Sequence, residues 1–130
     1  MRHQDWPARL ARFVVQARSR PFEWSTADCA TFARDWFEEC TGRRVFEPRY
    51  FDALTAARYI ETQGGMLVAA TAVLGEPMPN PMAASRGDVA LVQIEERECL
   101  TIVLGEFAAG PGKAGLVMVP RDQMTAAWSI

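Results

Sequence analysis

Cys29 is the residue best placed for chemistry, because it stands where an amphipathic helix is expected to begin. The apolar residues that follow it recur at helical spacing: Phe32, Ala33, Trp36, Phe37 and Cys40. A thiol at a helix N-terminus lies in the positive field of the helix dipole, which favours the nucleophilic thiolate. The free backbone N–H groups there are also suited to binding an oxyanion. The alternative is a cysteine that serves only as a small buried hydrophobe, since Cys29 belongs to the same apolar stripe.

The other residues with catalytic or ligating chemistry are few. The three cysteines, Cys29, Cys40 and Cys99, are an odd number at wide spacings, which fits neither a disulfide framework nor a zinc site. The single histidine, His3, precedes the first expected helix, near a terminus, and we expect it to be solvated and without a catalytic role. The sequence therefore predicts no metal and no cofactor.

Helical patterns fill the first half of the chain and strand patterns fill the second. The expected helices cover about residues 7–20, 26–41, 52–63 and 67–74. The expected strands cover residues 89–94, 100–104 and 116–119. The first two strands are predicted to form a hairpin through the polar stretch EERE, and the tail RDQMTAAW is predicted to form a last helical turn, with Trp128 or Ile130 packed on the core. In the third helix we expect Leu54, Ala57 and Ile60 to face inward. Helices followed by a meander of strands are typical of an α+β fold.

The size and net charge of the chain restrict the classes of protein to which it can belong. A chain of 130 residues is expected to form one domain, residues 1–130. A net charge of −2 gives no global field for nucleic acid, and no window approaches the ~18 apolar residues of a membrane span. Arg9, Arg12, Arg18 and Arg20 are expected to form a solvated helix face rather than a nucleic-acid patch.

The segment PFEWSTADCATFARDWF resembles the nucleophile segment of NlpC-type, papain-like cysteine peptidases of the cell wall. The matching residues are Phe22, Trp24, Asp28, Cys29 and Phe32. Downstream, the sequence RGDV at 86–89 resembles the Gly-Asp before the family's first core strand, and LTIVLG at 100–105 resembles the strand that normally begins with the catalytic histidine. The resemblance covers roughly residues 20–120. It implies an α+β papain-like NlpC-type fold, with N-terminal helices packed on a small antiparallel sheet. It also implies Cys29 as nucleophile, with Trp24 and Asp28 as binding residues beside it.

The catalytic histidine that this resemblance leads us to expect is missing. Counted back from Gly105, its position falls on Cys99, give or take one residue, with Glu98 and Leu100 beside it. Glu98 is a poor base for a thiol, because the pKa of a glutamate, about 4.3, is far from that of the leaving group. If Cys99 replaces the histidine in space, it faces Cys29. A disulfide between them would need Cα atoms within ~7 Å.

The small size, the segment GLVMVP and the terminal Trp128 are similar to a phage-encoded branch of this superfamily whose members lie among tail genes. The resemblance implies a phage or prophage tail component at the tail tip, hub or baseplate. The start MRHQDWPARL has no apolar stretch suited to a signal peptide. We therefore expect synthesis in the bacterial cytoplasm and assembly into the virion.

Two functions follow from the missing base. The first is a degenerate, inactive peptidase fold that acts as a structural or binding module and contacts other tail or baseplate proteins, with peptidoglycan as a further partner. The second is an active peptidoglycan cysteine hydrolase that uses Cys29 with an atypical base, or with one supplied by a partner chain. Neither function predicts a nucleic-acid partner or a membrane span.

Overall fold

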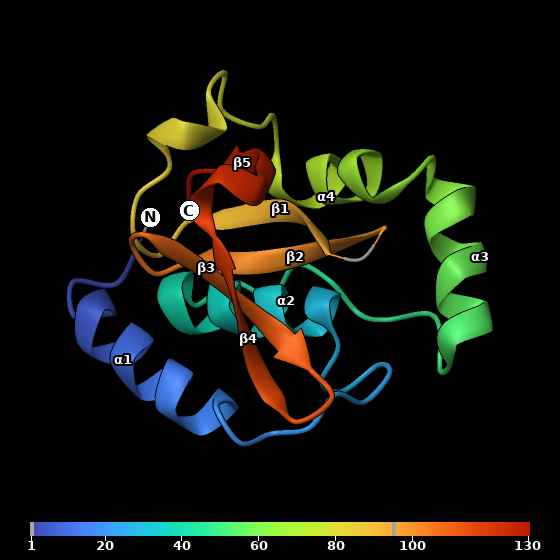
Figure 1. Cartoon of the computed structure of the whole chain (residues 1–130), viewed down its shortest axis with the longest axis horizontal. Coiled ribbons are helices and arrows are strands. Elements are labelled where there is room, and N and C mark those ends of the chain that lie inside the picture. Colours follow the sequence, from blue (N-terminus) through green and yellow to red (C-terminus); the bar gives the residue numbers. More distant parts are fainter. Residues whose placement is uncertain (1, 95) are drawn as a thin grey trace.

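The computed structural model describes residues 2–94 and 96–130. Over this part of the chain, helices come first and strands follow, as the sequence predicts (Figure 1). The elements are α1 (Trp6–Ala17), α2 (Cys29–Thr41), α3 (Ala53–Gln63), α4 (Met66–Leu74), β1 (Val89–Ile94), β2 (Arg97–Val103), β3 (Phe107–Gly112), β4 (Gly115–Pro120) and β5 (Met124–Trp128). The chain thus has a mixed α+β fold.

The strands form one antiparallel sheet in the order β4-β3-β2-β1-β5. The predicted hairpin is present as β1 and β2, in which Val92 lies opposite Cys99. On its other side β2 pairs with β3 only near its end, at Ile102 and Val103. The beginning of β2, which carries Cys99, is therefore not covered by β3, and α2 packs against β2.

Hydrophobic cores lie on both faces of the sheet. The larger core joins α1 and α2 to one face and includes Leu10, Trp36 and Leu91. The smaller core lies on the opposite face and includes Val92 and Met124. Leu91 and Val92 belong to different cores because successive side chains of a strand point to opposite faces. In Figure 1, α1 and α2 lie together, whereas α3 and α4 form a separate pair beside the turn of β1 and β2.

The predicted inward face of the third helix is wrong at Leu54 and Ala57, whereas Ile60 is half-buried. Leu54 is 59% exposed and Ala57 is exposed, whereas Ala56 is buried. Tyr59, one turn further on, lies with its ring centroid 5.9 Å from that of Tyr50. We attribute the rotation of α3 to this aromatic contact with the segment just before the helix, which the periodicity of the helix itself does not indicate.

The tail also differs from its predicted helical turn. Only residues Arg121–Gln123 form a short 3-10 turn, and Met124–Trp128 form β5. Pairing with β1 imposes the extended conformation, because tertiary context decides strand formation more than local preference does. Trp128 is fully buried, as the sequence predicts, and its indole N–H donates to the carbonyl of Gly75 at 2.9 Å.

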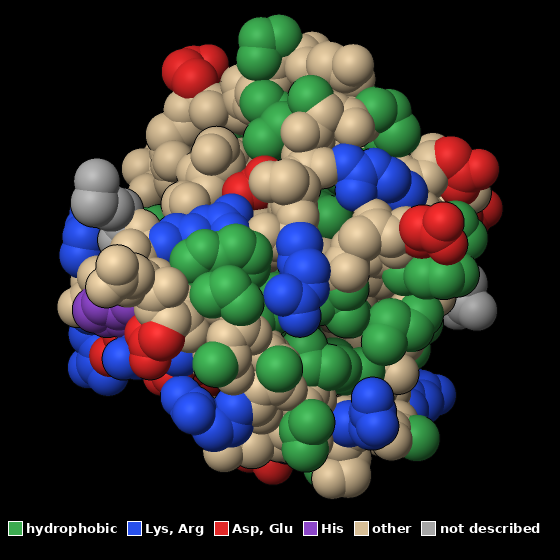
Figure 2. Space-filling view, turned by 90° about the vertical axis from the view of Figure 1, so that its left-hand side faces the viewer, with side chains coloured by type: hydrophobic (Ala, Val, Ile, Leu, Met, Phe, Trp, Pro, Cys, Tyr) green, Lys and Arg blue, Asp and Glu red, His purple; other side chains and the backbone are tan. Residues whose placement is uncertain are grey.

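The arginines of the first helix are partly neutralised. Arg9 pairs with Asp5 and Glu39, and Arg12 also reaches Glu39. Figure 2, which views the side of the molecule on the left of Figure 1, shows Lys and Arg side chains interspersed with acidic and hydrophobic ones. Among the described residues, no helix combines the length and the apolar character needed to cross a membrane.

Candidate functional site

A buried cap fixes Cys29 as the first residue of α2. The Asp28 carboxylate accepts a hydrogen bond from the backbone N–H of Thr31 at 2.9 Å, and the Thr31 hydroxyl accepts one from the backbone N–H of Asp28 at 3.0 Å. The other carboxylate oxygen accepts the backbone N–H of Ser25 at 2.8 Å. Asp28 is 2% exposed. The helix therefore begins three residues later than its pattern predicts, and both oxygens of Asp28 are engaged by the loop and the helix.

Asp28→Ala is expected to lower the free energy of unfolding by about 1–2 kcal/mol, because it removes a cap and leaves buried N–H groups without acceptors. Asp52→Ala is a matched control, since Asp52 caps α3 through the same arrangement with Thr55 on an exposed surface. Urea denaturation of both variants measures the difference. A loss for Asp28→Ala no larger than that for Asp52→Ala would show that burial of the cap adds nothing.

Cys29 and Cys99 meet where α2 packs against β2. A hydrogen bond joins their side chains, and the backbone N–H of Leu100 also points to the Cys29 sulfur. Both cysteines are free thiols and both are partly exposed. The structure thus brings together the predicted nucleophile position and the position of the missing histidine.

The hydrogen bond separates the pKa values of the two thiols. It lowers the pKa of Cys99, which lies at about 7, and the charge of Arg97 lowers this pKa further while burial opposes both. The pKa of Cys29 is raised well above its ordinary value, first by the hydrogen bond to Cys99 and next by burial, although the N–H of Leu100 opposes the rise. The pair therefore gives up one proton near neutral pH and keeps the second. The helix N-terminus alone favours a thiolate on Cys29, whereas the hydrogen bond between the two side chains favours one on Cys99.

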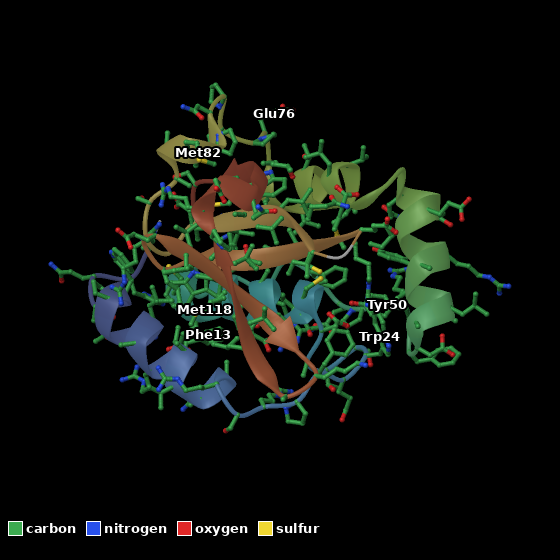
Figure 3. The ribbon with its side chains drawn as sticks, viewed as in Figure 1. Phe13, Trp24, Tyr50, Glu76, Met82 and Met118 are labelled. Atoms are coloured by element: carbon green, nitrogen blue, oxygen red, sulfur yellow. The ribbon has the colours of Figure 1, made fainter. Side chains whose placement is uncertain are left out.

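Aromatic side chains stand beside the cysteine pair. The ring of Trp24 lies edge-on to that of Tyr50, with centroids 6.3 Å apart, and the Arg97 guanidinium carbon lies 6.0 Å from the Trp24 ring. Figure 3 shows Trp24 and Tyr50 next to each other, to the left of the lower half of α3. Burial raises the pKa of Tyr50, and the nearby Asp28 carboxylate raises it further, so this phenol stays neutral. The sequence pattern singles out Trp24 but gives no signal for Tyr50, which lies in an irregular segment.

An apolar groove lies between α2, α3 and α4, near the cysteine pair. Ala33, Tyr59 and Val73 line it. Its lining extends to Ala30 and Leu100, which are the chain neighbours of Cys29 and Cys99. The groove encloses about 90 Å³ and neither cysteine is among its lining residues, so it is a small apolar hollow beside the pair.

His3 lies at the opposite end of α2 from the cysteine pair. Its backbone N–H donates to the carbonyl of Cys40 at 2.7 Å. Its imidazole lies against Gly42, where a Cβ atom would come within 3.3 Å of Nε2. Because α2 has 13 residues, roughly 20 Å separates this imidazole from Cys29. His3 therefore cannot act as the base for Cys29.

Two further kinds of group were candidates for a role beside Cys29: the carboxylate Glu98 and a bound metal ion. Glu98, which precedes Cys99 on β2, is exposed to solvent, and no hydrogen bond joins it to either cysteine among the described residues. Within residues 2–94 and 96–130, no group of three or more His, Cys, Asp or Glu side chains is arranged to hold a metal ion.

The sequence model of one protein family matches residues 1–130, and this family is described as a domain of unknown function, DUF6950. A comparison with curated proteins found no match.

Proposed function

The chain belongs to the DUF6950 family, and we propose that it is a structural or binding component of a phage or prophage tail, built on a papain-like NlpC-type fold that has lost peptidase activity. The observation that carries the loss of activity is the pairing of Cys29 with Cys99. A papain-like mechanism needs a base that takes the thiol proton and later returns it to the leaving amine. A Cys99 thiolate that accepts a hydrogen bond from Cys29 leaves Cys29 protonated.

The tail location rests on the resemblance of roughly residues 20–120 and of the segment GLVMVP to phage-encoded members of the NlpC superfamily. A surface feature supports a module that docks on other proteins. Apolar side chains on α3, on α4 and just before α3 are exposed: Phe51, Leu54, Leu67, Val68 and Val73. Exposed apolar clusters of this kind commonly mark contacts with protein partners. We propose an apolar surface of another tail or baseplate protein as the partner.

The second candidate function is an active peptidoglycan cysteine hydrolase with an atypical base. The apolar groove that reaches the neighbours of Cys29 and Cys99 favours it. In this case the Cys99 thiolate accepts the Cys29 proton as a peptide carbonyl is attacked, or a partner chain supplies an imidazole. The backbone N–H groups at the start of α2 then stabilise the oxyanion.

Incubation of the reduced protein with purified peptidoglycan and with an N-acetylated dipeptide amide separates the two functions. We expect release of amino groups no faster than with the Cys29→Ala variant. If the wild type releases amino groups and the Cys29→Ala variant does not, the hydrolase is supported and the inactive module is overturned.

The tail location is tested by mass spectrometry of purified phage particles from a strain that encodes the chain. Absence of the chain from these particles would contradict that location.

A further inference from the structure

We propose that Cys29 and Cys99 form a redox site, at which a small-molecule disulfide of the glutathione class converts the two thiols reversibly into an intramolecular disulfide. The inference is independent of the proposed function, because it needs only the two sulfurs and an exchange partner.

The placement of the three cysteines carries the inference. The side chains of Cys29 and Cys99 are in hydrogen-bond contact, although they come from a helix and a strand 70 positions apart in the chain. A disulfide joins two sulfurs at ~2.05 Å, and these two side chains already contact each other in the folded chain. Cys40 lies 11 positions after Cys29 on α2 and is fully buried. It is therefore out of reach of both the pair and the solvent.

Access and charge favour Cys99 as the thiol that reacts first. It is partly exposed, lies on the stretch of β2 that β3 does not cover, and feels the positive charge of Arg97. Its pKa of about 7 keeps a substantial share of thiolate at neutral pH, and the thiolate is the form that attacks a disulfide. Cys29 then stands beside the modified sulfur as the resolving thiol.

The reaction balances in two exchange steps. The Cys99 thiolate attacks one sulfur of the small disulfide, forms a mixed disulfide and releases one small thiolate. Cys29 gives its proton to that thiolate or to water, its sulfur attacks the Cys99 sulfur, and the second small thiolate leaves. Two protein thiols are thus oxidised while one small disulfide is reduced to two small thiols.

Oxidation has a structural consequence. The new bond ties the first residue of α2 to β2 and consumes both of the groups that the hydrolase function would require. The oxidised chain therefore has no free thiol at the site, and the cross-link stabilises the folded state by restricting the unfolded chain. A small-molecule thiol in excess reverses both steps.

The test treats the reduced, folded protein with glutathione disulfide and follows its free thiols with a chromogenic disulfide reagent. We expect two of three thiols to disappear without a change in chain mass beyond the loss of two hydrogens. Digestion without reduction should yield a peptide pair linked through Cys29 and Cys99. The initial rate should rise about tenfold between pH 6 and pH 8, as the thiolate fraction rises.

Variants assign the roles of the three cysteines. Cys40→Ser should form the same linked pair, whereas Cys29→Ser should retain a glutathione mixed disulfide on Cys99, because it has no resolving thiol. Persistence of three free thiols in the wild type would overturn the proposal. So would glutathione on both Cys29 and Cys99, or a disulfide between two chains. The wild-type measurement is decisive even if a variant fails to fold.

Discussion

Replacing Cys99 by histidine is expected to make Cys29 a reactive thiolate at pH 6. In the wild type, the hydrogen bond to Cys99 and burial raise the pKa of Cys29 well above its ordinary value. An imidazole at the same place accepts the thiol proton, and the resulting imidazolium favours the thiolate. In the variant, the N-terminus of α2, the N–H of Leu100 and the new base all lower the pKa of Cys29. In the wild type, the first two lower this pKa while the hydrogen bond to Cys99 raises it.

The expected gain in the alkylation rate of Cys29 by iodoacetamide at pH 6 is on the order of tenfold to a hundredfold. A larger thiolate fraction raises the rate, and the weaker nucleophilicity of a low-pKa thiolate offsets part of the increase. Mass spectrometry assigns the label to Cys29 rather than to Cys40. Cys99→Ser is the matched baseline, because it removes the Cys99 thiolate without adding a base.

Equal rates for Cys99→His and Cys99→Ser would mean that position 99 does not correspond to the family's histidine, and would remove the main support for an NlpC-type site. Hydrolysis of peptidoglycan by Cys99→His, with none by the wild type, would instead support descent from an active peptidase.

The features that could be predicted from the sequence are those that local residues determine. The stop Gly42 lies in the same short segment as the apolar stripe of α2, and the helix ends there as expected, although the cap at Asp28 places its start three residues later than the pattern predicts. The interest in position 99 came from the resemblance to the order and spacing of NlpC-type motifs, which stays a prediction. The structure shows that Cys99 contacts Cys29.

The features that the sequence could not reveal depend on distant partners. The strand β3 has the sequence FAAGPG, which is poor in β-branched residues, and it is extended because β4 pairs along its whole length. The exposure of Leu54 follows from contacts of α3 with a loop. Tyr50 and Arg97 join the site from segments that have no periodicity in common with α2. The direction of proton sharing in the cysteine pair likewise needs the geometry, because the helix N-terminus alone predicts the opposite result.

Asp88→Ala is expected to lower the free energy of unfolding by about 2–4 kcal/mol, because it breaks a largely buried ion pair and leaves several donors unpaired. The Asp88 side chain is 4% exposed and accepts a hydrogen bond from the Arg2 guanidinium at 2.7 Å. It also accepts the backbone N–H groups of Ser85, at 2.9 Å, and Ile130, at 3.2 Å. One carboxylate thus joins the two ends of the chain to the loop before β1.

The same cluster explains the Gly-Asp motif without a catalytic role. Gly87 has a φ of 94°, and a Cβ atom there would come within 2.7 Å of the Arg2 guanidinium, so a side chain would disturb the ion pair. The carbonyl of Gly87 accepts the indole N–H of Trp36 at 2.8 Å, which ties α2 to the start of β1. The motif therefore holds α2 and the sheet in the relative position that brings Cys29 to β2.

A carboxylate in an exposed ion pair is the matched control for Asp88. Glu47 contacts Arg34 and Arg44, but its side chain is 63% exposed, so Glu47→Ala is expected to cost less than about 0.5 kcal/mol. Urea denaturation of both variants, together with Arg2→Ala and the double variant, gives the coupling between Arg2 and Asp88. A loss for Asp88→Ala as small as that for Glu47→Ala, or additive effects of the Arg2 and Asp88 changes, would mean that the cluster does not hold the termini. In that case the placement of Cys29 against β2 would have to rest on the packing of Trp36 and its core neighbours alone.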